Sequence, residues 1–137
     1  MKVQNELKNR TIEVIVAESI KEDYPSYRLE VGLDTEIIKG SFRKHIWISL
    51  GDLENFISSL NELDKTRKGQ AEIQGMSPGE FTLYFRAIDN LGHLAVGINL
   101  LEEDRIANDY SYDIKVEFQV DPTILPSVIS DLRKIIE

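Results

Sequence analysis

The sequence predicts an α+β fold, in which two helices pack on one face of a mostly antiparallel sheet of about seven strands. One observation is a pattern that occurs twice, 72 positions apart, in residues 46–60 and 118–132. Each copy has alternating apolar residues, then an N-cap residue, then apolar residues at helical spacing. We interpret the repeat as architectural and not as evidence of gene duplication, because any two strand-to-helix transitions with similar packing would look alike.

The second observation is that seven stretches alternate apolar and polar side chains as half-buried strands do. The last of them has eleven residues of unbroken alternation, and this length predicts a strand near the middle of the sheet. Residues 1–10 are polar, and we expect them to be frayed or an irregular edge. The predicted strands cover approximately residues 12–16, 27–33, 41–48, 71–73, 81–87, 94–100 and 110–120.

The first helix is expected at about residues 50–67. Ser49 and Asp52 have the spacing of a capping box, in which the Ser49 hydroxyl accepts a hydrogen bond from the Asp52 amide and the Asp52 carboxylate reaches back. Gly69 is expected to follow the helix with a left-handed backbone conformation. The apolar stripe of this helix consists of Leu53, Phe56, Ile57, Leu60 and Leu63.

The second helix is expected at about residues 123–136. Asp121 followed by Pro122 is a favourable helix start, but Pro126 would then remove a hydrogen bond inside the helix. Either the first turn is irregular, or the cap lies at Thr123, where Pro126 removes no bond. Val128, Ile129 and Leu132 should be buried with the first stripe. The sheet residues expected beneath the two helices are Leu83, Phe85, Val96, Ile98, Ile114, Val116 and Phe118.

Length and composition place the chain in a broad class. Its 137 residues are expected to form one globular domain over 1–137. A composition of 42% hydrophobic and 29% charged residues argues against intrinsic disorder. There is no cysteine, so disulfides and thiolate chemistry are excluded. The first residues lack the apolar centre of a signal peptide, and no apolar run approaches membrane-spanning length. We expect a cytoplasmic protein without a membrane partner.

Charge is the second informative quantity. The chain has 16 Lys and Arg against 24 Asp and Glu, a formal net charge of −8. Nucleic acid and anionic lipid should be repelled by such a chain, whereas a basic protein partner should be attracted. Solubility alone is the simpler reason for this acidity, and it takes precedence unless another feature favours a basic partner.

The sequence offers little catalytic chemistry. His45 and His93 have no second histidine, cysteine or carboxylate at metal-ligand spacing, and no phosphate loop or hydrolase motif is present. We therefore expect no catalytic residue, no metal and no cofactor. Acidic residues near position 105 fit either a solvated loop or a partner-binding patch, and two aromatic residues on polar faces fit either a covered position or an interface. The candidate partner-binding residues are Glu102, Glu103, Asp104, Asp109, Asp113, Trp47 and Tyr84.

Several short motifs of the second half resemble the WapI family of immunity proteins. They follow a helix at 49–63 and end in a terminal helix with Leu132-x-x-Ile135. The motifs are Gly69-x-Ala71, Gly92-His93-Leu94-x-Val96 and Phe118-x-x-Asp121-Pro122-Thr123-x-Leu125. The resemblance covers roughly residues 40–137. It implies a small bacterial cytoplasmic protein that binds and inhibits a cognate toxin domain, often a nuclease, without catalytic residues of its own.

The functional hypothesis is therefore a non-enzymatic immunity protein that neutralises a toxin, possibly a basic nuclease, through an acidic surface. Two other classes stay open at this point. A small-molecule-binding or scaffold domain would be favoured by a large apolar pocket. A carboxylate-based enzyme would be favoured by a buried acidic pair with raised pKa values in a cleft.

Overall fold

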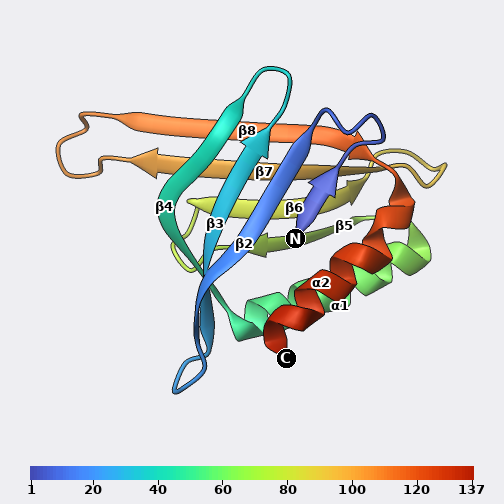
Figure 1. Ribbon diagram of the computed structural model, residues 1–137, viewed down its shortest axis with the longest axis horizontal. Helices are drawn as coiled ribbons and strands as arrows, with labels where there is room; N and C mark the ends of the chain where they lie inside the picture. Colours follow the sequence, from blue (N-terminus) through green and yellow to red (C-terminus); the bar gives the residue numbers. More distant parts are fainter.

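The computed structural model describes residues 1–137 and contains two consecutive blocks of the same topology (Figure 1). Each block is a four-stranded antiparallel sheet in sequential order, followed by a helix. The first block comprises β1 (Lys2–Gln4), β2 (Thr11–Ile20), β3 (Ser26–Asp34), β4 (Lys39–Ser49) and α1 (Leu50–Thr66). The second comprises β5 (Gln70–Gln74), β6 (Phe81–Ala87), β7 (Leu94–Glu103), β8 (Ser111–Val120), the 3₁₀ turn η1 (Pro122–Ile124) and α2 (Leu125–Ile136).

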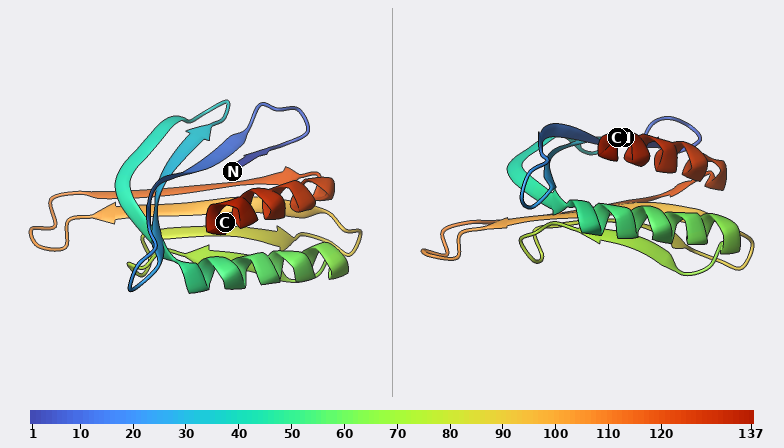
Figure 2. Two further views of the ribbon diagram at one scale, coloured as in Figure 1. Left: turned by 60° about the horizontal axis from the view of Figure 1, so that its bottom comes forward. Right: turned by 90° about the horizontal axis from the view of Figure 1, so that it is seen from below.

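The two sheets and the two helices enclose one apolar core. The first sheet arches across one face of the second sheet, and α1 and α2 lie side by side next to it (Figures 1 and 2). One cluster of 29 buried residues includes members of both sheets and both helices. Phe56 of α1 and Phe85 of β6 meet in this cluster with ring centroids 6.5 Å apart, so the two blocks share their core.

The predicted α+β fold with two helices is confirmed, with eight strands in two sheets where we expected about seven in one. The additional strand is β1, in the segment that we expected to be frayed or irregular. Val3 of β1 is buried and pairs with Ile12, so this segment forms one edge of the first sheet. Three residues are too few to show an alternation that sequence analysis could recognise.

The prediction that the eleven-residue stretch lies mid-sheet is wrong, because β8 is an edge strand paired only with β7. Alternation reports that one face of a strand is buried, but it does not report how many neighbours the strand has. The outward residues of β8 include Asp113, Lys115 and Glu117, and charged side chains of this kind protect a free edge from pairing with other chains. The edge position also explains why Ile114 and Val116 are only half-buried.

Helix α1 begins where the sequence predicts. Ser49 Oγ accepts a hydrogen bond from the Asp52 amide at 3.0 Å. The helix ends one residue earlier than expected, and Arg67 is the left-handed residue that caps it, with φ 56°. Gly69 also has the expected left-handed conformation, with φ 80°, but it lies two residues beyond the cap. The Arg67 guanidinium compensates by donating to the backbone oxygen of Asp64 at 3.0 Å and to its carboxylate at 3.2 Å.

Helix α2 takes the first of the two alternatives, an irregular first turn. Asp121 Oδ1 accepts from the Thr123 amide at 3.0 Å and starts η1, which passes directly into the α-helix at Leu125. Pro126 is then the second residue of α2, where no intrahelical hydrogen bond is lost. No helix in the structure is long and apolar enough to cross a membrane.

Candidate partner-binding surface

The hairpin formed by β7 and β8 extends beyond the rest of the molecule (Figures 1 and 2). We call its outer part, residues 102–113, the hairpin end. The five acidic residues predicted from the sequence all lie there, namely Glu102, Glu103, Asp104, Asp109 and Asp113, with Arg105 as the one basic residue. The register that pairs Glu102 with Tyr112 and Glu103 with Ser111 brings the two runs of acidic residues onto one end of the molecule.

Three of these five carboxylates have structural partners, and one of them, Glu103, accepts a hydrogen bond from Arg105 Nε at 3.2 Å. Glu102 and Glu80 both bind the ammonium group of Lys44, which reaches across from β4, with 2.6 Å between Lys44 Nζ and Glu80 Oε1. Partial burial disfavours the charged form of Lys44, but the hydrogen bonds that it donates to Glu102 and Glu80 outweigh this effect and raise its pKa. Lys44 therefore ties the first sheet to the base of the hairpin end.

Asp104 shapes the loop at the hairpin end. Its carboxylate accepts from the amides of Ile106 and Ala107, both at 3.1 Å, and from the amide of Asp109 at 3.4 Å. The hydrogen bond from Ala107, followed by those from Ile106 and Asp109, lowers the pKa of Asp104. The loop is thus closed by an ionised side chain whose oxygens already accept hydrogen bonds from the backbone.

Asp109 and Asp113 have no ion-pair partner in the structure and are free to meet a partner's cations.

Large apolar side chains are exposed beside these carboxylates. Ile106 is 98% exposed, Tyr112 61% and Tyr110 44%, and the two tyrosine rings lie 5.7 Å apart. The alternation of residues 110–120 placed both tyrosines on the buried face, so the sequence analysis did not select them. The mismatch between an eleven-residue predicted strand and its seven-residue predicted neighbour was the available signal, since the extra residues extend past the core that could cover them.

The two aromatic candidates from the sequence lie elsewhere. Tyr84 does point away from the core, as predicted, but it is only 7% exposed because its ring occupies the space above Gly97. Its hydroxyl donates to Glu117 at 2.5 Å, and Arg86 binds the same carboxylate at 2.6 Å. Trp47 of β4 is half-buried, and its backbone oxygen accepts from the Met76 amide at 2.8 Å. The structure therefore does not bring Trp47 and Tyr84 together with the hairpin end.

The Tyr84–Glu117–Arg86 group has strongly shifted titration. Burial, followed by the hydrogen bond to Glu117, raises the pKa of Tyr84 to about 12. The hydrogen bonds from Arg86 and then Tyr84 lower the pKa of Glu117 to about 2. This carboxylate is held ionised by a cation and a phenol, which is the arrangement of a structural network on the outer face of the second sheet.

Charge is divided unequally between the blocks. Residues 1–69 hold eleven Lys and Arg against twelve Asp and Glu, a formal charge of −1. Residues 70–137 hold five against twelve, a formal charge of −7. The acidity of the chain is thus a property of the second block, which also carries the hairpin end.

The histidines have local surroundings only. His93 Nδ1 lies 2.5 Å from the Asp89 carboxylate, which also accepts from the Leu91 amide in the turn between β6 and β7. The hydrogen bond from His93 is the main cause that lowers the pKa of Asp89. His45 is exposed on the outer face of β4. No group of three metal-ligating side chains forms in the structure.

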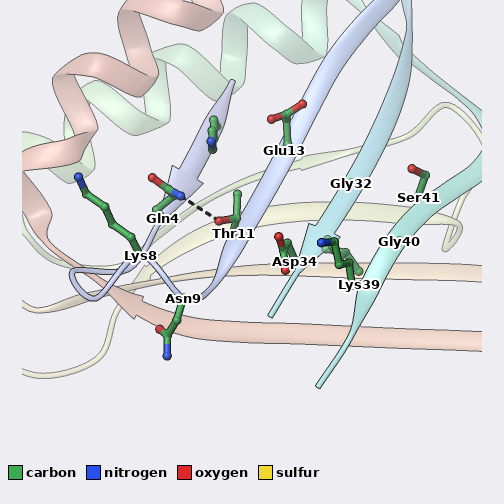
Figure 3. A pocket seen from close by; sticks show the side chains of 12 residues that line it. Gln4, Lys8, Asn9, Thr11, Glu13, Gly32, Asp34, Lys39, Gly40 and Ser41 are labelled. Atoms are coloured by element: carbon green, nitrogen blue, oxygen red, sulfur yellow. Dashed lines mark hydrogen bonds between the residues drawn. The ribbon is translucent and has the colours of Figure 1, made fainter. Parts of the chain in front are cut away.

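A hollow of about 410 Å³ lies on the outer face of the first sheet (Figure 3). Its floor is formed around Gly32 and Gly40, and Gln4 donates to Thr11 at 3.1 Å at one side. Eleven of its twelve lining residues are not hydrophobic. This hollow is therefore not the large apolar pocket that would favour a small-molecule-binding domain.

The carboxyl groups with shifted pKa values are all shifted downward, opposite to the pattern of a carboxylate acid catalyst.

Comparison with known proteins gives one informative match. No curated protein matches the chain. The crystal structures of trypanosoma bruciei MRP1/MRP2 align over 96% of this chain and 80% of that chain, with 11% identity and a TM-score of 0.39. A TM-score this low does not establish a shared fold. The model of the immunity protein WapI-like family matches residues 6–137, nearly the whole sequence. The chain therefore belongs to the WapI-like immunity protein family, which indicates a toxin-neutralising role.

Proposed function

We propose that this protein neutralises a basic toxin domain, such as a nuclease, by binding it through the acidic surface of the second block, with the hairpin end at its centre. The observation that carries the proposal is the concentration of a formal charge of −7 in residues 70–137 of a chain that belongs to an immunity protein family. Residues of the predicted site, Glu103, Asp109 and Asp113 among them, gather at one protruding end.

Electrostatics explains why such a surface suits this function. A nuclease needs a basic groove to hold phosphates, and an acidic inhibitor approaches that groove with a favourable long-range potential. Opposite potentials raise the association rate and reject partners of the wrong charge more than they increase affinity. An immunity protein benefits from fast capture, because each toxin molecule that escapes it can act repeatedly.

The test begins with co-expression of the chain and the toxin domain encoded beside it, scored by survival and by isolation of the complex. The association rate should fall steeply as salt concentration rises. Absence of both rescue and complex at micromolar concentrations would remove the immunity function. A complex whose association rate does not respond to salt would remove the electrostatic mechanism.

Charge reversal locates the surface. The variant with Asp109→Lys and Asp113→Lys removes two carboxylates that support no internal contact, so folding should be unaffected and association should slow by about tenfold or more. The matched control is Glu54→Lys with Glu62→Lys, which changes net charge equally at two exposed positions of α1 in the first block. Equal effects of the two variants would mean that overall charge, and not the hairpin end, governs binding.

A further inference from the structure

We propose that the hairpin end inserts into the nucleic-acid cleft of the toxin, with Tyr110, Tyr112 and Ile106 as its apolar anchors, and so excludes the toxin's substrate directly. This inference rests on the proposed function and goes further, because an inhibitor could also bind beside the cleft. The hairpin end would thus supply the residues that contact the toxin inside its cleft, and the toxin's nucleic-acid substrate would compete with it for that cleft.

The hairpin end is narrow, protruding and exposed. It is a ribbon only two strands wide, and it extends past both the first sheet and the helices (Figure 2). Ile106 is almost fully exposed at the turn, and Tyr110 and Tyr112 form an exposed aromatic pair behind it. Large aromatic side chains surrounded by polar residues are typical of the few positions that dominate binding energy in protein interfaces.

The hairpin end is already ordered by internal hydrogen bonds and an ion pair. Three amides of the loop bind the Asp104 carboxylate, and the Asp104 amide donates to the Tyr110 carbonyl oxygen at 3.0 Å, which closes the loop. At the base, Lys44 holds Glu102 from the other sheet. A hairpin that is already ordered loses little conformational entropy on binding, which favours insertion as a rigid body.

The hairpin end combines negative charge with aromatic rings. Clefts for single-stranded nucleic acid pair a basic groove with surfaces on which bases stack. The hairpin end offers the unpaired carboxylates of Asp109 and Asp113 together with two tyrosine rings, so it can satisfy both features of such a cleft. The loops at the far end of the first sheet also expose apolar residues, Leu7 and Ile37. Three lysines and two carboxylates line the hollow near these loops, so this end of the molecule lacks the concentrated negative charge of the hairpin end.

The experiment measures displacement of a fluorescein-labelled single-stranded RNA oligonucleotide from the purified toxin domain. The wild-type protein should displace the oligonucleotide fully at a stoichiometric ratio. The variant with Tyr110→Ala and Tyr112→Ala should need a concentration at least about 30-fold higher, and the variant with both changed to Phe should stay within about threefold of wild type. The control is Tyr24→Ala, a tyrosine with 64% exposure in the loop between β2 and β3, which should have no effect.

The outcomes separate this inference from the proposed function. A ternary complex of toxin, oligonucleotide and wild-type protein would overturn insertion into the cleft while leaving neutralisation intact. A toxin domain that forms the complex but binds no nucleic acid would overturn it as well. Loss of displacement in the Tyr24 variant to the same degree as in the hairpin variant would show that the tyrosines of the hairpin end have no special role. Absence of any complex would reject the proposed function itself.

Discussion

The two blocks of this protein have the same topology but differ in surface charge. Each runs through four antiparallel strands in order and then into a helix, and the capping residues Ser49 and Asp121 are 72 positions apart. The first block is nearly neutral, with a formal charge of −1, and it covers the core with its arched sheet. The second carries −7 and the protruding hairpin. The shared apolar pattern thus sets the architecture of both blocks, whereas their outward-facing residues can differ in charge.

The blocks also differ on the outer faces of their sheets. In the first, Arg28 lies 3.2 Å from Glu18 and 3.8 Å from Glu30, and both carboxylates are more than half exposed. In the second, Arg86 and Tyr84 bind the better-covered Glu117, and Tyr84 occupies the space above Gly97. Exposed ion pairs contribute little to stability, so the network of the second block should be the one with measurable consequences.

The largest expected effect would show that the blocks depend on each other. Phe56 of α1 is 1% exposed and contacts Phe85 of the second block. The change Phe56→Ala should lower the free energy of unfolding by roughly 3–5 kcal/mol, because it removes a large buried side chain and leaves a cavity. Urea denaturation followed by fluorescence and by circular dichroism should still give one transition. The exposed neighbour Asn55→Ala is the control, and a loss below about 1 kcal/mol for Phe56→Ala would show that the two blocks do not share a core.

The next effect contrasts glycines in the equivalent third strands. A Cβ atom at Gly97 of β7 would lie 2.1 Å from the Tyr84 ring, so Gly97→Ala must displace that ring and should cost roughly 1–3 kcal/mol. A Cβ atom at Gly32 of β3 would find its nearest neighbour 3.9 Å away, so Gly32→Ala should be neutral or slightly stabilising. Thermal unfolding of both variants tests the contrast, and equal melting temperatures would contradict it.

The largest pH-dependent contribution to stability should come from the second block. Glu117 has a pKa lowered to about 2 from its ordinary 4.5, so its contribution is complete above pH 4.5 and is lost as pH falls toward 2. Allowing for solvent around the group, we expect roughly 1–2 kcal/mol to disappear in this window. Glu117→Gln should remove that component from a series of urea titrations, whereas Glu30→Gln in the exposed pair should not. Parallel curves for wild type and Glu117→Gln would contradict the assignment.

The smallest effect compares the two helix starts. Ser49→Ala should destabilise the protein by roughly 0.5–2 kcal/mol and Ser49→Gly by less, because the hydroxyl satisfies an amide of the first turn. Asp121→Ala should cost a similar amount, since its carboxylate accepts from both the amide and the hydroxyl of Thr123. Chemical denaturation resolves differences of this size. Negligible effects at both positions would show that neither helix depends on its cap.

Local patterns alone were sufficient for the fold class, both helices and seven of the eight strands. Helical stripes such as Leu53, Phe56 and Leu60, and strand alternation such as Leu83 with Phe85, report which face of an element is buried, and these residues are indeed buried. The sequence also singled out the acidic residues of the hairpin end, and their role in binding stays a prediction. Their position on one end of the molecule follows from pairing within a single hairpin, which is a contact between segments close in sequence.

Tertiary structure alone decided the remaining features, because they depend on contacts between segments distant in sequence. The division of the strands into two sheets, and the place of β8 at an edge, depend on the number of neighbours each strand finds. Tyr84 is buried because Gly97 of the next strand leaves room for its ring, and Lys44 meets Glu102 because the first sheet arches over the second. Tyr110 and Tyr112 continue an inward-facing pattern yet are exposed, since the hairpin extends past the core that would have covered them.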